Sequence, residues 1–298
     1  MENNIQFAAI DIGSNAVRLL IKSYQPSAPD EGLRKELMVR VPLRLGQESF
    51  VSGQISDNKS KKLTKLMRAF KHLMFVYDVT EYRACATSAM RDASNSGKLV
   101  KEIEKKTGIA IEIITGQEEA LIIYESHFAD SLDQELNHLY VDVGGGSTEI
   151  SLISNGNLQK SQSYNIGTVR LLNGMVKDTE LERMRADLHD LKSTYKISDI
   201  IGSGGNIIKL QSLSKNGKKN SVITLHELER INKELKMYPV DERMLRFKLK
   251  PDRADVITHA ADIYIEAAKA SGCQNIIVPA IGLADGINHL LYSRFKSV

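Results

Sequence analysis

The feature that most constrains this chain is a pattern that occurs twice. In each copy an apolar run ends in an aspartate, a glycine-containing turn follows, and a second β-rich run begins. The copies are residues 6–12 with Asp11, the turn at residues 13–15 and the run 17–23, and then residues 139–143 with Asp142, the turn at residues 144–146 and the run 148–154. Such runs around turn residues are typical of strands joined by tight connections. The pattern predicts two pseudo-equivalent halves that face each other across a cleft.

The remaining periodicity favours an α/β fold. Between residues 56 and 77 apolar residues recur at the helical period, at Leu63, Leu66, Met67, Phe70, Leu73 and Met74. Strand-like runs at residues 82–86 and 109–114 flank a charged helical segment, and the second half repeats this βαβ rhythm. A chain of 298 residues also exceeds what one core usually holds. We therefore expect two α/β domains, residues 1–124 and residues 125–298.

Composition narrows the class of protein. The 42% hydrophobic and 26% charged residues are typical of a folded chain, and the net charge of +3 gives no global basic field that would select nucleic acid. No apolar run approaches the ~18 residues that span a bilayer, so neither export nor a membrane partner is expected. Cys85 and Cys273 lie far apart without a CxxC motif, which argues against a zinc site or a disulfide framework and fits a cytoplasmic protein.

The glycine turns and aspartates point to phosphate chemistry. Glycines let backbone N–H groups approach phosphate oxygens closely, and a third such turn lies at residues 202–206 with Gly204 and Gly205. The carboxylates of Asp11 and Asp142 would repel each other unless a cation lay beside them, and Mg²⁺ bridging to phosphate is the natural candidate. Each turn taken singly is common, since aspartate often serves only as a turn residue.

Seven ordered motifs carry a resemblance to a known family. They are DIGSNAVRLLI from Asp11, ATSAMRDASN from Ala86, IEIITGQEEA from Ile111, VDVGGGSTEIS from Val141, NIGTVRL from Asn165, IGSGGN from Ile201 and RADVI from Arg253. Together they resemble exopolyphosphatase/guanosine pentaphosphate phosphohydrolases, which belong to the actin/Hsp70/sugar-kinase superfamily. The resemblance implies two actin-like (RNase H-like) domains and a short form without the helical HD-type domains of longer relatives. Where the family commonly shows GLREG, residues 282–286 read GLADG.

Two adjacent glutamates separate into different roles. Thr115 followed three residues later by Glu118 predicts a capping box that opens a helix, so Glu118 has a structural explanation. Glu119 has no such local duty, and the resemblance implies that it is the catalytic base that deprotonates water. Arg91 could be an ordinary surface arginine, but a guanidinium beside a helix start can hold a phosphoryl oxygen, and the resemblance makes it a phosphate clamp.

The other candidate residues also have structural alternatives. Phosphate contacts are expected from the glycine turns and their neighbours, namely Ser14, Asn15, Gly144, Gly145, Gly146, Ser147, Thr148, Gly204 and Gly205. The alternative is that the hydroxyl and amide side chains only stabilise the turns. The metal ligands are expected to be Asp142, with Asp11 and Glu149. By strand alternation Glu149 faces opposite to Thr148, so a solvated position is the alternative there.

The expected activity is hydrolysis of the terminal phosphate of inorganic polyphosphate, with Mg²⁺ or Mn²⁺. The alternative within the same chemistry is 5′-phosphate removal from guanosine pentaphosphate. Alternatives of another class are a non-catalytic phosphate- or nucleotide-binding regulator and an ATP-dependent kinase of the same superfamily. The lysine-containing loop at residues 214–220 is expected to be solvated and is the one obvious auxiliary contact for a polyanion. The residues leave the oligomeric state open, a homodimer included.

Overall fold

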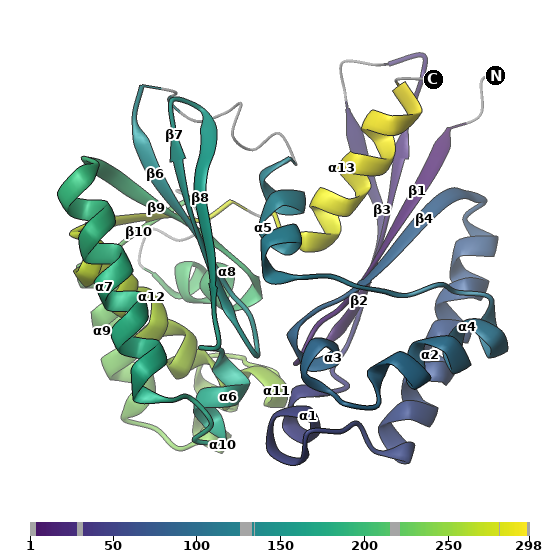
Figure 1. The fold of residues 1–298 in the computed structure, drawn as a ribbon, viewed down its shortest axis with the longest axis horizontal. Coiled ribbons are helices and arrows are strands. Elements are labelled where there is room, and N and C mark those ends of the chain that lie inside the picture. The colour runs from purple at the N-terminus through teal and green to yellow at the C-terminus, as the bar shows by residue number, and fades with distance from the viewer. Residues whose placement is uncertain are drawn as a thin grey trace. The chain divides into compact units, whose positions relative to one another are not determined.

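The chain forms two compact units in the structure, which is a computed structural model. It describes residues 4–28, 32–125, 133, 135–214, 221–279 and 281–296. Unit 1 comprises residues 1–128 together with 282–298, and unit 2 comprises residues 129–281. The C-terminal segment therefore differs from the expected division at 125–298. Its helix α13 (Leu283–Lys296) buries an apolar face against β1, β2 and the helix α5 of unit 1 (Figure 1).

Unit 1 is built on a five-stranded sheet of order β3-β2-β1-β4-β5. Its strands are β1 (Ile5–Ile12), β2 (Val17–Tyr24), β3 (Leu33–Val41), β4 (Val79–Ala86) and β5 (Glu112–Ile113). Its helices are α1 (Gly46–Ser52), α2 (Asp57–Val76), α3 (Ser88–Asp92), α4 (Ser96–Thr107), α5 (Gly116–Tyr124) and α13. The amphipathic helix expected between residues 56 and 77 is α2. The side chain of Ser56 caps its first turn by accepting a hydrogen bond from the Lys59 N–H.

Unit 2 is built on a six-stranded sheet of order β10-β11-β9-β6-β7-β8. Its strands are β6 (Asn137–Val143), β7 (Thr148–Ser154), β8 (Asn157–Tyr164), β9 (Ile197–Ser203), β10 (Val222–Thr224) and β11 (Asn275–Ile277). Its helices are α6 (Thr168–Leu172), α7 (Asp178–Thr194), α8 (Gly205–Leu213), α9 (Leu225–Lys236), α10 (Val240–Arg246), α11 (Pro251–Ala254) and α12 (Ile257–Ser271).

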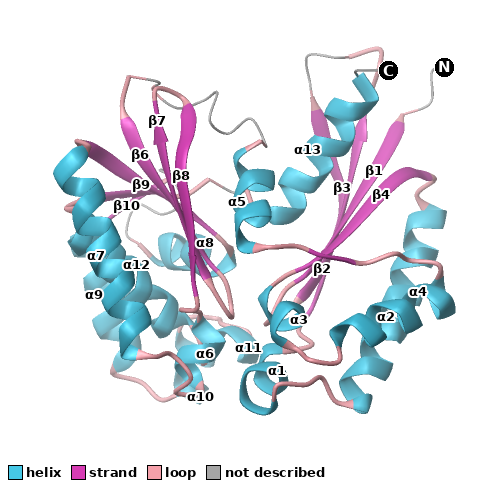
Figure 2. Ribbon diagram, in the orientation of Figure 1, coloured by secondary structure: helices cyan, strands magenta, loops and turns pink. Residues whose placement is uncertain are grey.

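The repeat seen in the sequence is a repeat of topology. In unit 1 β1 pairs antiparallel with β2 and parallel with β4, and in unit 2 β6 pairs antiparallel with β7 and parallel with β9. Figure 2 shows the strands of each unit as one sheet flanked by helices. The strands β1, β4 and β5 run in the same direction, as do β6, β9 and β11. Each unit therefore gathers the loops that follow three parallel strands at one edge, the usual place for ligands in open α/β sheets.

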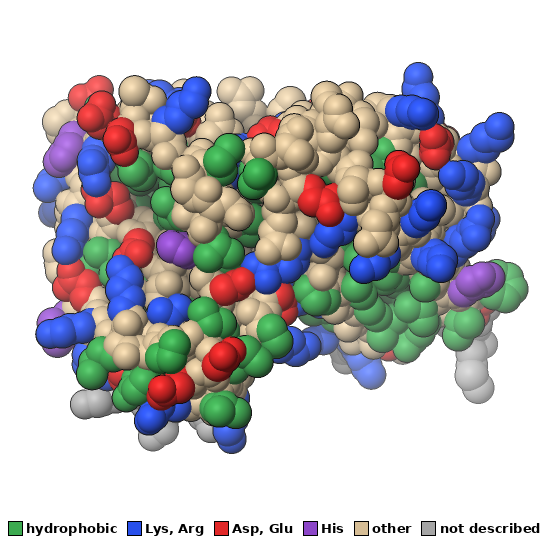
Figure 3. All heavy atoms as spheres, turned by 90° about the horizontal axis from the view of Figure 1, so that it is seen from below, with side chains coloured by type: hydrophobic (Ala, Val, Ile, Leu, Met, Phe, Trp, Pro, Cys, Tyr) green, Lys and Arg blue, Asp and Glu red, His purple; other side chains and the backbone are tan. Residues whose placement is uncertain are grey.

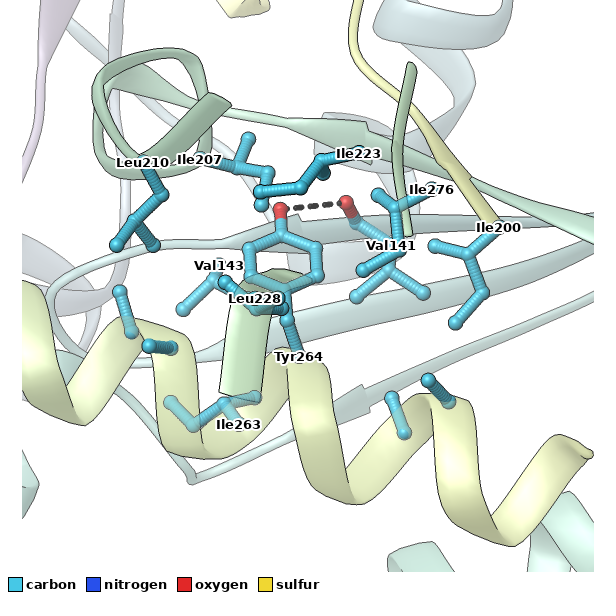
Figure 4. Packing of buried hydrophobic residues seen from close by; sticks show 14 of the residues in the cluster. Val141, Val143, Ile200, Ile207, Leu210, Ile223, Leu228, Ile263, Tyr264 and Ile276 are labelled. Atoms are coloured by element: carbon cyan, nitrogen blue, oxygen red, sulfur yellow. Dashed lines mark hydrogen bonds between the residues drawn. The ribbon is translucent and has the colours of Figure 1, made fainter. Parts of the chain in front are cut away.

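The core of unit 2 centres on Tyr264 of α12, which is 0% exposed. Its ring packs among residues of both sheet strands and helices, including Val141, Ile200 and Leu210 (Figure 4). Its hydroxyl lies 2.6 Å from the carbonyl oxygen of Ser203 and 3.0 Å from that of Val141, and burial raises its pKa well above the ordinary value. Tyr264 thus satisfies backbone groups at the ends of β6 and β9.

Two further observations bear on the expectations from composition. Among the described residues, no helix is both long and apolar enough to cross a membrane. Cys85 and Cys273 are buried free thiols, and burial raises the pKa of Cys85 to about 12. Residues 215–220, which include the lysines of the expected auxiliary loop, lie outside the described residues.

Candidate active-site residues

In unit 1 the candidate residues follow the ends of the three parallel strands. Ser14 lies in the turn after β1, Arg91 lies on α3 after β4, and Glu119 lies on α5 after β5. Backbone hydrogen bonds join these connections, because the Thr87 N–H donates to the Ile12 carbonyl and the Ile114 N–H donates to the Ala86 carbonyl. The strand order therefore brings these three segments of the chain to one edge of the sheet.

The turn after β1 is tied to α3 by a hydroxyl. The Ser14 Oγ lies 2.8 Å from the Ser88 Oγ and accepts a hydrogen bond from the Ala89 N–H at 3.2 Å. Ser14 is 2% exposed, and the carbonyls of Ser14 and Asn15 accept hydrogen bonds from the chain that enters α1. These contacts fit the structural alternative for Ser14 and also fix the turn beside the start of α3. Phosphate contact by Ser14 and Asn15 stays a prediction.

The two glutamates of α5 divide as the capping pattern predicts. The Thr115 Oγ1 accepts from the Glu118 N–H, while the Glu118 carboxylate accepts from the Thr115 N–H at 2.7 Å and from the Thr115 hydroxyl at 2.9 Å. These hydrogen bonds lower the pKa of Glu118. Glu119 takes no part in the capping box and is buried, with 8% of its surface exposed. The capping box is confirmed, and Glu119 is left for another role.

Arg91 is the cation beside Glu119. Its Nη1 lies 3.6 Å from Oε2 of Glu119 and donates a hydrogen bond to the Ile114 carbonyl at 2.7 Å. The carbonyl contact holds the guanidinium at the end of β5, and the Arg91 side chain is only 23% exposed. A carboxylate and a guanidinium held together in this way can orient a water molecule and a phosphoryl oxygen respectively.

Asp11 has an internal partner that the sequence reading did not assign. Asp11 lies opposite Arg18 in the β1–β2 pairing, and the Arg18 Nη1 lies 2.5 Å from Oδ2 of Asp11. The Asp11 side chain is 6% exposed, so Arg18 supplies the positive charge that a buried carboxylate needs. The pairing was readable from the sequence, because two residues at equal distances from the centre of a tight hairpin face each other.

In unit 2 the glycine loop after β6 is held by hydrogen bonds from the residues of α6. The Gly144 N–H donates to the Ser147 carbonyl, and the Val169 N–H donates to the Gly145 carbonyl at 2.8 Å. Arg170, which is 8% exposed, donates from Nε to the Gly146 carbonyl at 2.6 Å. Among the described residues, no hydrogen bond from the backbone N–H of Gly145 or Gly146 is recorded. The three loop carbonyls are therefore hydrogen-bonded within unit 2, and the N–H groups of Gly145 and Gly146 are the expected contacts for an anion.

The hydroxyl side chains of this loop are buried, which argues against their direct contact with a phosphate. Thr148 is 0% exposed and donates from Oγ1 to the Ile166 carbonyl, while Ser147 is 3% exposed. The Thr148 hydroxyl therefore links the start of β7 to the segment that precedes α6. Any phosphate contact at these two residues falls to the backbone and stays a prediction.

Asp142 and Glu149 form the carboxylate pair of unit 2. They face each other across β6 and β7, so their side chains lie on the same face of the sheet. Glu149 is 1% exposed and accepts a hydrogen bond from the Ser163 hydroxyl at 2.9 Å, which excludes the solvated position that alternation had left open. Neighbouring carboxylates on one face favour a bound cation or a shared proton.

Gly204 borders the same carboxylates. It follows β9, whose last residue Ser203 pairs with Asp142, and it has a φ of +100°. A Cβ atom at Gly204 would lie 3.1 Å from Oδ1 of Asp142, so the glycine leaves the space over that carboxylate open. Gly205 begins α8, whose first N–H groups point to this end of the sheet.

These residues fit a hydrated Mg²⁺ better than an all-protein metal cage. Among the described residues, no group of three or more His, Cys, Asp or Glu side chains is arranged to hold a metal ion. Mg²⁺ is usually held by one or two carboxylates, with waters and substrate phosphates as the remaining ligands. Asp142 and Glu149 supply such a pair, whereas Asp11 is already paired with Arg18.

The structure gives contacts to two arginines and to the GLADG segment, to which the sequence analysis assigned no role in the site. Arg18 and Arg170 lie inside recognised motifs, yet their contacts depend on the hairpin register and on α6. In the GLADG segment, Asp285 accepts a hydrogen bond from the Gly282 N–H at 3.1 Å and pairs with Lys22 at 2.8 Å. Asp285, which departs from the GLREG pattern, therefore caps the start of α13 and ties this helix to β2 through Lys22.

Comparison with known proteins identifies the family. A sequence model of the Ppx/GppA phosphatase family matches residues 37–295. A bifunctional 3-dehydroquinate synthase/phosphatase of Fusobacterium nucleatum is 27% identical, over 93% of this chain and 45% of that protein. A guanosine-5'-triphosphate,3'-diphosphate pyrophosphatase of Aeromonas hydrophila is 26% identical, over 96% of this chain and 59% of that protein. The chain thus spans about half the length of these curated relatives.

Solved structures match over the whole chain. The Ppx/GppA family member of Aquifex aeolicus has a TM-score of 0.77 at 26% identity, with 99% of each chain covered. An exopolyphosphatase of Cytophaga hutchinsonii has a TM-score of 0.83 at 22% identity, with 98% of each chain covered, and shows the shared fold. The expected fold of two actin-like α/β domains and the expected resemblance are confirmed. With the strand order and the motifs, these matches show that the chain belongs to the Ppx/GppA phosphatase family.

Proposed function

We propose that this protein hydrolyses the terminal phosphoanhydride bond of inorganic polyphosphate. The observation that carries the proposal is the pair formed by Glu119 and Arg91 in unit 1. Glu119 is buried, is left out of the capping box and lies 3.6 Å from a guanidinium that the Ile114 carbonyl holds in place. A base and an adjacent cation at the carboxyl ends of parallel strands suit attack of water on a phosphoryl group.

In this proposal Glu119 accepts a proton from the attacking water, and Arg91 stabilises the negative charge that grows on the phosphoryl oxygens. The Gly145 and Gly146 N–H groups, with the first N–H groups of α8, bind phosphate oxygens of the chain. Arg170 keeps the glycine loop in its binding conformation through the Gly146 carbonyl. Hydrolysis breaks the terminal P–O–P bond, adds the water oxygen to the released phosphate and leaves the polymer one unit shorter.

Asp142 and Glu149 are the proposed ligands of Mg²⁺ or Mn²⁺, and the ion would supply positive charge that offsets the phosphate oxygens. Asp11 belongs to this set only if substrate or metal displaces Arg18 from it. The support for the metal is the placement of two carboxylates at opposed positions of adjacent strands, with Gly204 leaving the space above Asp142 open.

A second candidate substrate is guanosine pentaphosphate, from which the 5′-terminal phosphate would be removed. The observation that favours it is the similarity to the Aeromonas hydrophila enzyme named guanosine-5'-triphosphate,3'-diphosphate pyrophosphatase. Both reactions use the same base, clamp and phosphate contacts, so these residues do not discriminate between them.

Phosphate release from polyphosphate, guanosine pentaphosphate and ATP at matched concentration tests the proposal. The expected result is Mg²⁺-dependent release from polyphosphate at the highest kcat/KM, with none in excess chelator. Preferred cleavage of guanosine pentaphosphate would select the second substrate. Full activity in chelator, or an Asp142→Asn variant with unchanged metal dependence, would contradict the metal site.

A further inference from the structure

The solvent face of α2 is a strongly basic surface of unit 1. The helix carries six lysine and arginine residues and one carboxylate, Asp57 at its first position. The neighbouring α4 adds four lysines against two glutamates. The whole chain has a net charge of only +3, so the remainder is acidic overall. Figure 3 shows blue side chains gathered over the part of unit 1 where α2 and α4 lie.

Three cations and one imidazole form a stripe on α2. Lys61, Lys65, Arg68 and His72 are spaced four, three and four residues apart, which places them on one side of the helix, opposite the buried side of Leu63, Met67 and Phe70. All four are exposed. At 1.5 Å per residue, the stripe runs for roughly 16 Å.

The stripe is not neutralised by acidic neighbours. Among the described residues, Lys61, Lys65 and Arg68 form no ion pair, whereas other exposed cations such as Arg185, Arg246 and Lys269 do have carboxylate partners. Like charges repeated along a helix face are mutually repulsive and cost stability, so the stripe favours binding of an extended anion that neutralises several of them at once.

The start of α2 is joined to the segment that follows Arg91. The Asn95 side chain accepts a hydrogen bond from the Ile55 N–H at 3.1 Å and donates to the Ile55 carbonyl at 2.8 Å. The Ser94 N–H donates to the Gly53 carbonyl at 2.9 Å. The stripe therefore begins at the end of α2 that is fixed to the α3–α4 connection, and it leads away from the candidate site along unit 1.

We propose that the α2 stripe, Lys61, Lys65, Arg68 and His72, is an auxiliary binding site for the distal part of a polyphosphate chain whose end is held near Arg91 and Glu119. The proposal rests on the proposed function for its substrate. Polyphosphate is the occupant that the charges favour, because it carries a negative charge on every unit and can neutralise several cations of the stripe at once. Longer chains gain contacts that short chains lack.

The test replaces the lysines and the arginine of the stripe with glutamate and measures binding of polyphosphate without turnover. The variant Lys61→Glu/Lys65→Glu/Arg68→Glu is compared with Lys160→Glu/Lys177→Glu/Lys233→Glu, which makes the same change in net charge at exposed positions of unit 2. Calorimetric titration with long-chain polyphosphate and with tripolyphosphate is done in excess chelator at low salt. Circular dichroism checks that α2 is intact.

The α2 variant is expected to lose about tenfold or more in affinity for the long chain and less than about twofold for tripolyphosphate. Its salt dependence should become shallower by roughly two units, from about 0.7 per lost contact. The unit 2 variant should match the wild type. Equal losses in the two variants, equal losses for both chain lengths, or no loss at all would overturn the proposal, as would loss of affinity for single-stranded RNA with polyphosphate binding unchanged.

Failure of this site and failure of the proposed function are distinguishable. Length-dependent binding that the α2 variant loses, in a protein that releases no phosphate, would contradict the function and support the site. Phosphate release with the same ratio of long-chain to short-chain kcat/KM in the wild type and the α2 variant would contradict the site and support the function.

Discussion

The hairpins β1–β2 and β6–β7 occupy the same place in their sheets but differ in charge. Asp11 faces Arg18 across the first hairpin, whereas Asp142 faces Glu149 across the second. The first hairpin thus contains the cation that its buried aspartate needs, while the second places two carboxylates side by side. Like charges at directly opposed positions destabilise a sheet unless something neutralises them. The repeat of topology is therefore not a repeat of chemistry.

The difference assigns separate tasks to the two units. Unit 1 contains the buried glutamate, the fixed arginine and an aspartate with an internal ion pair. Unit 2 contains the glycine loop that Arg170 holds through the Gly146 carbonyl, and the opposed carboxylates of Asp142 and Glu149. We expect unit 1 to activate water and unit 2 to hold phosphates and metal.

The largest expected effect concerns the base in unit 1. Glu119→Gln should lower kcat for polyphosphate hydrolysis by at least ~10²-fold, because the amide cannot accept the proton from water. Binding of polyphosphate should be nearly unchanged. The matched control is Glu118→Gln one position earlier, which should cost far less turnover because Glu118 serves the capping box. Equal losses of turnover in two folded variants would show that the division between these glutamates is wrong.

The next effect tests the charge difference between the hairpins. Arg18→Gln leaves the buried Asp11 without its ion pair and should lower the free energy of unfolding by about 1–3 kcal/mol, less than for a wholly buried pair because Arg18 is 32% exposed. Glu149→Gln removes one of two neighbouring carboxylates and should leave the free energy unchanged or raise it by up to about 1 kcal/mol. Denaturant unfolding in excess chelator measures both. If both variants changed the free energy of unfolding by the same amount and in the same direction, the proposed charge difference between the two hairpins would be wrong.

A close contact in unit 1 gives a smaller expected effect. A Cβ atom at Gly286 of α13 would lie 2.3 Å from the Ile122 carbonyl oxygen of α5, so Gly286→Ala should push apart the two helices. We expect a loss of about 1–3 kcal/mol in stability and a fall in kcat greater than any rise in KM, because α5 carries Glu119. Gly282→Ala is the control, since a Cβ there meets nothing within 4 Å. A kcat equal to that of the control would contradict a positioning role.

The smallest effect is a pH dependence of the capping box. The pKa of Glu118 is lowered from its ordinary 4.5 by hydrogen bonds from Thr115, so the carboxylate stabilises the folded state above that value. The contribution is lost as the pH falls through the lowered folded-state pKa. Wild type should therefore be slightly more stable than Glu118→Gln at pH 7, with the difference vanishing in acid. Parallel stability profiles down to acid pH would argue against this contribution.

The sequence predicts those features that depend on local patterns. The capping box of Thr115 and Glu118, the amphipathic α2 and the repeated glycine hairpins all follow from spacing within a few residues. The edge strand β3 was not predicted, because its exposed charged residues mask the alternation that marks a half-buried strand. Helix α13 was assigned to the wrong unit, because its packing on α5 depends on contacts between distant parts of the chain.

The candidate site divides in the same way. Glu119, Asp142 and the glycine loop could be selected from motifs, since each is the residue type that phosphate chemistry requires. The contact of Arg170 could not be assigned without the position of α6, and the solvated alternative for Glu149 stayed open until the strand pairing placed it opposite Asp142. The charge of the α2 surface was also hidden in the sequence, because the net charge of +3 averages a basic helix with an acidic remainder.

The central claim is that the carboxylate pair of unit 2 binds the divalent cation and the ion-paired Asp11 of unit 1 does not. Electron paramagnetic resonance titration of Mn²⁺ into metal-free protein tests it directly, with wild type, Glu149→Gln and Asp11→Asn measured side by side. The account predicts one bound Mn²⁺ per wild-type chain, at least about tenfold weaker binding in Glu149→Gln and unchanged binding in Asp11→Asn. Wild-type affinity in Glu149→Gln together with loss of binding in Asp11→Asn would contradict it.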